Sequence, residues 1–235
     1  MKKSILLVLI PTLFTTGCFS SSISEDKMKQ VVSDIETNID NGNFTNVHIR
    51  DKLQYQFDYK EGSFYRYHNF ALLILVPITD TEATWEENGK YYHYEYNSMT
   101  KKTIDEEIDK AAFDTYMVKH KASIAAQLMA PVNASKKLLG TYDYGEIPVN
   151  KYEDIQGASY KLNSFEKKYT QKGTGIYYVD MYEDGVEKRV EKQDKHTIVY
   201  KNSLPVEWTT KNDGESKWKY SYGKAEFTNP KQKTE

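Results

Sequence analysis

Apolar and polar residues alternate along much of the chain, which predicts that most of it is β-strand. Between Leu53 and Lys60 every second residue is apolar or aromatic, the period of two of a half-buried strand. Phe70–Val76 is apolar at every position and ends at Pro77, so we expect a strand that is covered on both faces. From residue 155 to residue 227, strand-like stretches and turns recur about every 8–12 residues, which is typical of an antiparallel meander.

Turn residues mark where the predicted strands reverse. Asn88-Gly89 stands between two aromatic stretches and is a strong signal for a two-residue hairpin. Gly173-Thr174-Gly175 lacks the lysine of a phosphate-binding loop, and we expect a hairpin turn there. Further turns are expected at Glu61-Gly62, Glu183-Asp184-Gly185, Lys201–Pro205 and Asn212-Asp213-Gly214.

Two stretches have the apolar spacing of helices. In Ser24–Thr37, Ser24 is a suitable N-cap and an apolar stripe begins at Met28. The second stretch runs from about Asp105 to Met129 without glycine or proline, and we expect Pro131 to end it, with a short helix over 134–139. In this interpretation the acidic residues 105–109 form the first helical turn, where the helix dipole favours anions.

The N-terminus has the pattern of an export signal. Lys2 and Lys3 precede the apolar stretch Ile5–Ile10, which is too short to span a bilayer. Thr16-Gly17-Cys18 then resembles the lipobox of bacterial lipoproteins, although Thr15 stands where such boxes usually carry an aliphatic residue. The resemblance implies that residues 1–17 are a signal peptide and that Cys18 is lipidated. The alternative is ordinary secretion with a cysteine that has no role.

We therefore expect a protein held by acyl chains such as palmitate on the extracytoplasmic face of a bacterial cell membrane. Residues 18–23, which include three consecutive serines, are expected to be a flexible lipidated tether. Stable anchoring takes two or three acyl chains, because a single chain holds a protein only weakly.

Composition excludes several classes of protein. With one cysteine in 235 residues the chain has no internal disulfide and no cysteine-based zinc site. The net charge of −2 gives no basic surface for nucleic acid, and a mean hydropathy of −0.74 excludes a polytopic membrane protein. No stretch with the composition of a linker divides the chain, so we expect one domain and a monomer.

Catalytic motifs are missing from the sequence. None of the five histidines belongs to a zinc-binding helix motif, and there is no nucleophile elbow, phosphate-binding loop or calcium loop. We expect no enzymatic activity, no cofactor and no metal. The aromatic residues stand out instead, at 14% of the chain with 20 tyrosines. They gather in two sets, which either cover a curved sheet or line a groove. The sets are Tyr91, Tyr92, Tyr94 and Tyr96, and Tyr177, Tyr178, Tyr182, Trp208, Trp218, Tyr220 and Tyr222.

The order of the predicted elements resembles the LolA/LppX-like superfamily of bacterial lipoproteins and lipoprotein carriers. A lipobox, an N-terminal helix, a meander, a long helix and a second meander that contains Leu204-Pro205-Val206 follow one another. The resemblance implies an α+β fold over residues 24–228, a strongly curved antiparallel sheet that forms an open half-barrel with helices on its concave face. Residues 229–235 are expected to be a frayed tail.

The same resemblance implies an apolar cavity between sheet and helices. The periodicity selects the residues that should point into it: Tyr55, Phe57, Tyr59, Leu72, Ile74, Ile108, Tyr116 and Leu128. Two functions remain open. One is binding or transfer of a hydrophobic, lipid-like ligand, and the other is a structural or interaction lipoprotein whose sheet surface binds a protein or cell-envelope partner. A cavity of roughly 300–1,000 Å³ favours the first, and a dense core with an exposed aromatic patch favours the second.

Overall fold

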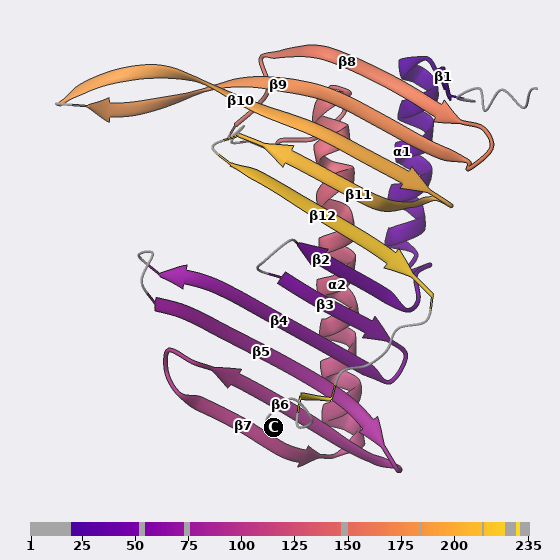
Figure 1. The fold of residues 1–235 in the computed structure, drawn as a ribbon, viewed down its shortest axis with the longest axis vertical. Coiled ribbons are helices and arrows are strands. Elements are labelled where there is room, and N and C mark those ends of the chain that lie inside the picture. The colour runs from indigo at the N-terminus through magenta and orange to yellow at the C-terminus, as the bar shows by residue number, and fades with distance from the viewer. Residues whose placement is uncertain are drawn as a thin grey trace, which may run out of the picture.

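A computed structural model describes residues 20–51, 55–72, 76–146, 150–183, 185–212, 214–223 and 229–230, with the backbone alone at 70–72 and 76. Cys18 and Ile74 lie outside the described residues. The described residues form twelve strands in one open antiparallel sheet and two helices (Figure 1). None of the described helices combines the length and the apolar character needed to cross a membrane.

The chain builds this sheet as two meanders. The elements are β1 (Ser20–Ser22), α1 (Glu25–Asp40), β2 (Val47–Asp51), β3 (Tyr55–Lys60), β4 (Ser63–Leu72), β5 (Val76–Glu87), β6 (Lys90–Asn97), β7 (Lys102–Ile108), α2 (Lys110–Leu138), β8 (Asp154–Asn163), β9 (Lys168–Glu183), β10 (Val186–Lys201), β11 (Leu204–Lys211) and β12 (Glu215–Tyr222). The strand order is β1-β8-β9-β10-β11-β12-β2-β3-β4-β5-β6-β7. The meander β2–β7 and the meander β8–β12 therefore meet where β12 pairs with β2.

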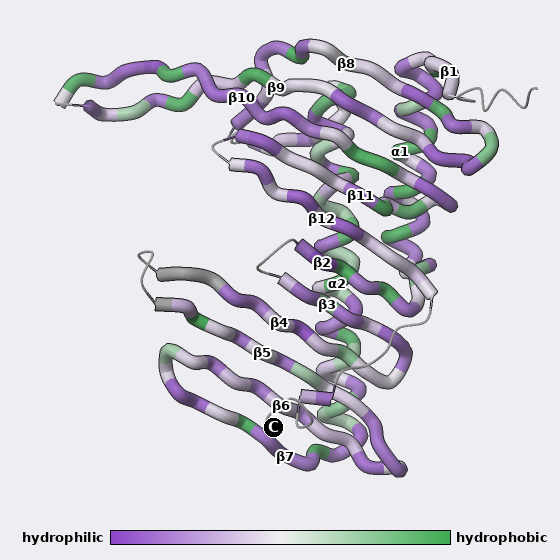
Figure 2. The backbone as a smooth tube through the Cα atoms, in the orientation of Figure 1, coloured by the Kyte–Doolittle hydropathy of each residue, from purple (hydrophilic) through white to green (hydrophobic). Residues whose placement is uncertain are grey.

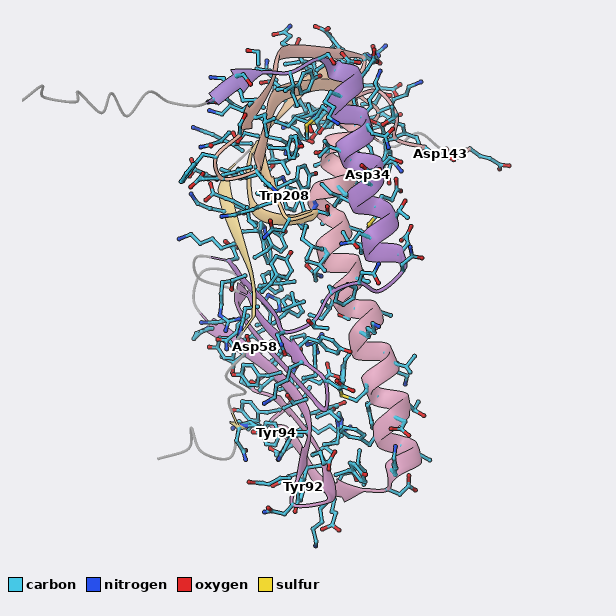
Figure 3. The ribbon with its side chains drawn as sticks, turned by 90° about the vertical axis from the view of Figure 1, so that its right-hand side faces the viewer. Asp34, Asp58, Tyr92, Tyr94, Asp143 and Trp208 are labelled. Atoms are coloured by element: carbon cyan, nitrogen blue, oxygen red, sulfur yellow. The ribbon has the colours of Figure 1, made fainter. Side chains whose placement is uncertain are left out.

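Both helices cover the same face of the sheet. In Figure 3 they form one layer, the strands form the other, and side chains fill the space between them. The main core cluster draws on α1, α2 and several strands, with Ile35, Ile49, Leu128 and Ile198 almost inaccessible to solvent. Figure 2 shows the same pattern, because hydrophobic residues recur along both helices. The expected α+β architecture of an open antiparallel sheet with helices on one face is confirmed in this form.

The first helix follows the sequence closely. The Ser24 side chain caps it by accepting a hydrogen bond from the Lys27 backbone N–H at 3.2 Å. The predicted stripe is buried and extends one turn further, to Ile39. The preceding segment differs from the expected flexible tether, because Ser20–Ser22 pair with β8 as β1.

The second helix differs from the prediction at both ends. Residues 105–108, expected in its first turn, belong to the edge strand β7, and α2 begins after Asp109, whose side chain accepts from the Ala112 N–H at 2.8 Å. Pro131 does not end the helix, which runs on to Leu138. A helical proline removes one backbone donor and normally kinks or breaks the helix. Here Pro131 is buried, and its carbonyl accepts a hydrogen bond from the Tyr200 hydroxyl at 3.2 Å.

The apolar segment Phe70–Val76 is not one strand. β4 ends at Leu72, β5 begins at Val76, and these two residues pair with each other. Pro77 lies inside β5 rather than ending a strand, and it pairs with Ala71. The pairing of β5 with β6 starts only at Asp80, so the missing N–H of Pro77 removes no bond to β6.

Gly173-Thr174-Gly175 is also not a turn but the middle of β9. A Cβ atom at Gly173 would lie 3.2 Å from Leu138, and one at Gly175 would overlap the ring of Tyr152. The glycines therefore make room for the end of α2 and for a tyrosine ring, which is a common reason for glycine inside a strand.

Beyond their neighbours, β9 and β10 continue as a two-stranded arm (Figure 1). The pairing of β8 with β9 stops at Ile176, and that of β11 with β10 stops at Lys195. We call residues 177–183 and 186–194 the arm. Several of its apolar side chains are exposed, among them Tyr182 at 76%.

Candidate functional site

A hollow of about 710 Å³ lies on the sheet face opposite to the helices, and we call it the tyrosine groove. Its walls and floor come from β3 to β6 together with one residue near the C-terminus. The lining residues are Gln56, Tyr65, Tyr67, Thr79, Thr81, Tyr94, Tyr96 and Pro230. The volume falls in the range of typical small-ligand sites.

Strand register creates the groove. In β4 and β6 the tyrosines alternate with residues on the helix side, and the central strand β5 carries small residues between them. Thr81 pairs with Tyr67 on one side and Tyr96 on the other, and Ala83 pairs in the same way with Tyr65 and Tyr94. Because cross-strand partners lie on the same face, two rows of large rings flank a floor of small side chains.

The groove is electrically neutral and rich in hydroxyl groups. Among its described lining residues no side chain is charged. Burial raises the pKa of Tyr65 to about 12 and also raises the pKa of Tyr94, so both phenols stay protonated at neutral pH. The site therefore offers aromatic faces and neutral hydrogen-bonding groups, and no group suited to ion binding.

A buried carboxylate holds the Gln56 wall in place. Asp58 is only 3% exposed, and its Oδ2 accepts a hydrogen bond from Gln56 Nε2 at 2.8 Å. Its Oδ1 lies 2.7 Å from Arg50 Nη2 and 2.5 Å from His48 Nδ1. A buried charge is tolerated when it is paired and hydrogen-bonded, as here, and the paired carboxylate fixes the wall.

Pro230 closes part of the groove. This residue is buried, although it stands in the segment that was expected to fray. Residues 231–235 lie outside the described residues. A proline of the chain itself therefore already lies among the groove tyrosines.

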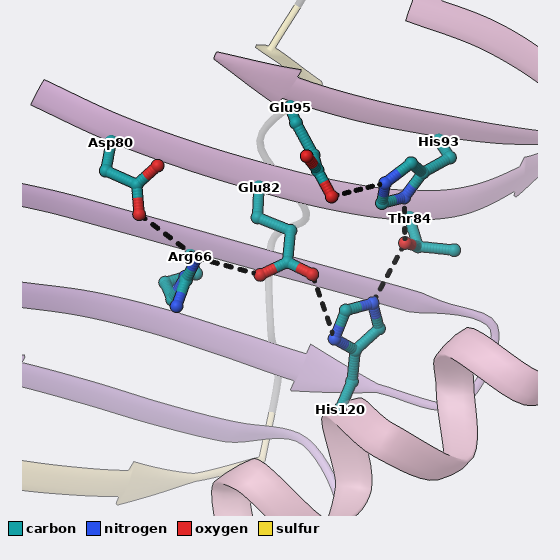
Figure 4. A network of polar contacts seen from close by, with 7 residues as sticks. All are labelled: Arg66, Asp80, Glu82, Thr84, His93, Glu95 and His120. Atoms are coloured by element: carbon teal, nitrogen blue, oxygen red, sulfur yellow. Dashed lines mark hydrogen bonds and ion pairs between the residues drawn. The ribbon is translucent and has the colours of Figure 1, made fainter. Parts of the chain in front are cut away.

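A second candidate is a network of polar side chains on the helix side of β4–β6 (Figure 4). We call it the histidine network, and it consists of Arg66, Asp80, Glu82, Thr84, His93, Glu95 and His120. Thr84 Oγ1 lies 2.9 Å from His120 Nε2 and 3.0 Å from His93 Nδ1. His93 Nε2 lies 3.0 Å from Glu95 Oε1.

The following arrangement of protons satisfies this chain of bonds. His120 Nε2–H donates to Thr84, the Thr84 hydroxyl donates to His93 Nδ1, and His93 Nε2–H donates to Glu95. His120 is neutral in this arrangement. This agrees with burial, which lowers the pKa of His120 to about 3. Phe64 stacks on His120 and Tyr116 stacks on His93, with ring centres 3.8 and 4.0 Å apart.

The histidine network fastens α2 to the sheet and gives no sign of a reaction site. His120 comes from α2, whereas Thr84 and His93 come from β5 and β6. The hollow beside Arg66, Glu82 and Glu95 measures about 120 Å³, which is small for a substrate. Within the described part of the chain no three His, Cys, Asp or Glu side chains are grouped so that they could hold a metal ion.

The predicted cavity residues are dispersed. Phe57 and Leu128 lie in the main core at 4% and 0% exposure, with Tyr55 and Tyr59 half-buried at its edge. Tyr116 belongs to the surroundings of the histidine network, and Ile108 ends the edge strand β7 opposite Tyr91. Leu72 ends β4 with its side chain undescribed, and Ile74 is outside the described residues. The structure thus brings Tyr55, Phe57, Tyr59 and Leu128 into one packed core region.

Half-buried aromatic side chains extend this region along the helix-side face. The Tyr55 ring stacks on His68 with centres 3.9 Å apart and lies 5.4 Å from Trp218, which pairs with Trp208. We call Tyr55, His68, Trp208 and Trp218 the aromatic row.

Sequence reasoning singled out Tyr94 and Tyr96 but missed the other half of the groove. Tyr65, Tyr67, Thr79 and Thr81 lie outside the two aromatic sets of the sequence analysis and were not singled out. The signal that identifies them is the combination of alternating tyrosines on two strands with alternating small residues on the strand between.

Comparison with known proteins adds little. No family model matches the chain, and no curated protein matches it either. Among solved structures, the crystal structure of LprF from Mycobacterium bovis is similar to this chain with a TM-score of 0.34 and 12% sequence identity. The match covers 89% of this chain and 99% of that chain. A likeness this distant transfers neither fold nor function.

Proposed function

We propose that the protein is a lipid-anchored, non-enzymatic binding protein of the bacterial cell envelope, which holds a protein or other envelope partner in the tyrosine groove. The observation that carries the proposal is the groove itself, a neutral hollow of about 710 Å³ walled by four tyrosines. Tyrosine combines an apolar ring with a polar tip and is enriched at interfaces for that reason.

The position of the groove relative to the anchor supports a partner outside the bilayer. Cys18 lies two residues before β1, and β1 lies at one end of the sheet. Nine strand-to-strand steps separate β1 from β5 in the sheet order. At about 4.8 Å a step this places the groove roughly 40 Å from the anchored end. A protein or other partner in the envelope can reach a groove at that distance from the membrane, whereas the acyl chains of the bilayer cannot.

A second candidate is the binding of a hydrophobic, lipid-like ligand on the helix side of the sheet, as in a strongly curved half-barrel. The aromatic row favours it, because Tyr55, Trp208 and Trp218 are half-buried and adjoin the core without being enclosed by it. Against it, Phe57 and Leu128, which were expected to line the cavity, are packed in the core.

Site-specific photocrosslinking distinguishes the two candidates. The photoreactive amino acid p-benzoylphenylalanine is placed at position 94, in a groove wall where it replaces one aromatic side chain by another, in the full-length protein in bacterial cells. We expect a defined adduct on irradiation and its loss when Tyr96→Ala removes one wall. Position 165 is the control, because Phe165 is 86% exposed on the β8–β9 turn, far from the groove.

The lipid-like ligand is tested on a chain that begins at Ser20, which keeps every described element. Saturable binding of a fluorescent fatty acid that Trp218→Ala weakens, without any adduct at position 94, would establish the second candidate in place of the first. Adducts of equal yield from positions 94 and 165 would also contradict the groove proposal.

A further inference from the structure

The occupant of the tyrosine groove is suggested by the residue that already lies in it. Pro230 is buried and contributes to the lining with Tyr65, Tyr67, Tyr94 and Tyr96. It reaches the groove from the segment that follows β12, although β12 itself lies four positions away from β5 in the sheet order. A proline of the chain itself therefore shares the lining of this hollow with the groove tyrosines.

The chemistry of the lining matches an extended proline-containing peptide. Proline has no N–H, so such a peptide presents carbonyl acceptors and ring surfaces. The groove presents the complement, because the half-buried Tyr67, Tyr94 and Tyr96 offer hydroxyl groups and aromatic surface, and Thr79 and Thr81 offer two further hydroxyl groups. Aromatic-lined grooves bind proline-rich segments in this way, because the ligand is already extended and loses little conformational entropy.

Charge supports the same ligand. The described lining side chains carry no charge, so recognition does not require an acidic or basic partner. The remaining hollow of about 710 Å³ extends beyond Pro230 and leaves space for more of a peptide than one ring.

We propose that the tyrosine groove binds an extended, proline-containing peptide segment of a partner protein, and that Pro230 is an internal occupant which the partner displaces. This inference rests on the proposed function of the groove. Displacement has a measurable consequence, because a site that is partly occupied by its own chain binds an external ligand with an apparent affinity reduced by the occupied fraction.

Fluorescence anisotropy with a labelled decaproline peptide tests the proposal on the chain from Ser20 to Glu235. We expect saturable binding that a peptide with every second proline replaced by alanine competes for weakly. Pro230→Ala should tighten decaproline binding by roughly 2- to 10-fold, since it removes the internal competitor. Thr81→Trp should abolish binding by filling the floor, and Tyr67→Ala should weaken it.

Two controls separate binding from folding. Tyr182→Ala removes a tyrosine of the arm that is 76% exposed and should leave decaproline binding unchanged. Thermal unfolding followed by circular dichroism checks that each groove variant is folded. If Tyr67→Ala unfolds, Tyr67→Phe replaces it, and this variant should retain ring stacking and lose only part of the affinity.

The possible failures are distinguishable. Unchanged or weaker binding by Pro230→Ala would overturn the role of Pro230 as a displaceable occupant. Binding of a soluble glycan such as chitohexaose that Thr81→Trp abolishes, with no binding of decaproline, would overturn the peptide proposal and leave the groove as a binding site. Absence of decaproline binding together with absence of the position-94 adduct would overturn both the peptide proposal and the proposed function of the groove.

Discussion

At the scale of single residues, burial favours the neutral forms of His120 and His196. His120 and His93 share Thr84, and His196 accepts from Trp208 Nε1 at 3.3 Å and lies 2.9 Å from the Tyr152 hydroxyl. Burial lowers the pKa of His196 as it does that of His120. A neutral histidine can donate through one nitrogen and accept through the other, which a protonated ring cannot do.

This neutrality predicts acid sensitivity. His120 titrates at about 3 in the folded protein and near 6.5 in the unfolded chain, so between these pH values the unfolded state binds more protons. The free energy of unfolding should therefore fall as the pH is lowered from about 6.5 towards 3. Urea unfolding at several pH values measures it, and His120→Phe, which keeps a ring against Phe64, should show a shallower decline.

Other titratable and charged groups near His120 also affect the pH profile, so the measurement has to be compared between two proteins that share them. Glu82 acts in the opposite direction, because burial raises its pKa and its contribution to stability is lost as the pH rises through that value. His93, Arg66 and Lys119 disfavour a positive charge on His120. His196 is retained in both proteins, so only the difference between the two pH profiles reports on His120. Parallel profiles would contradict the assignment.

At the scale of elements, local chemistry determined what could be predicted. Ser24 as N-cap and the Asn88-Gly89 turn follow from one or two residues, and both are confirmed, the turn with positive φ angles of 55° and 75°. The start of α2 could not be predicted in this way. β7 is an edge strand with mostly exposed, charged side chains, so its sequence has no apolar period and continues smoothly into the helix.

The tyrosine groove could not be predicted from the sequence for a different reason. Its walls are obvious tyrosines, but the hollow exists only because Thr81 and Ala83 lie between them, and that depends on the register of three strands. The alternation in β3, by contrast, correctly predicts that Tyr55, Phe57 and Tyr59 share one face of the strand. Whether such a face encloses a cavity or a packed core depends on helix packing, which periodicity does not report.

The revised start of α2 gives a capping prediction. Asp109→Ala removes the side chain that accepts from Ala112 N–H and should lower the free energy of unfolding by about 0.5–2 kcal/mol. Asp109→Asn keeps a capping oxygen and should lose much less. Chemical denaturation of the three proteins measures the difference. Equal losses from both variants would show that charge, and not the cap, is what matters.

The glycines of β9 give a packing prediction. Gly175→Ala should displace the Tyr152 ring and weaken its bonds to Asp194 and His196, at a cost of about 1–3 kcal/mol. Gly214→Ala is the matched control, because nothing lies within 4 Å of a Cβ atom there, and it should change stability by less than about 0.5 kcal/mol. Thermal unfolding compares the two, and similar losses would refute the close approach of Tyr152.

At the scale of the whole molecule, the expected anchor is joined almost directly to the sheet. Only Phe19 separates Cys18 from β1, and Ser20–Ser22 pair with Lys161–Asn163 of β8. Lipidation at Cys18, as proposed, would hold the sheet end that contains β1 and β8 near the membrane and present the end that contains the tyrosine groove away from it.

The anchor itself is tested by Cys18→Ser. This variant should leave the membrane fraction or accumulate as a precursor that retains residues 1–17, because the thioether that attaches the lipid cannot form. Membrane fractionation and intact-mass measurement compare it with the unmodified sequence. A variant that fractionates and migrates like wild type would refute lipidation at Cys18.

The pairing of β12 with β2 has a consequence for the order of folding. Trp218 pairs with Asp51 and Tyr222 pairs with Val47, so strands separated by most of the chain are neighbours in the middle of the sheet. Contacts between distant residues slow folding, because a long loop must close before they form. A chain that crosses a membrane from its N-terminus delivers β12 after every other strand. If this chain is exported as proposed, its two meanders would join only at the end of translocation, and until then the open edge of β2 would stay available to any other strand, including one from a second copy.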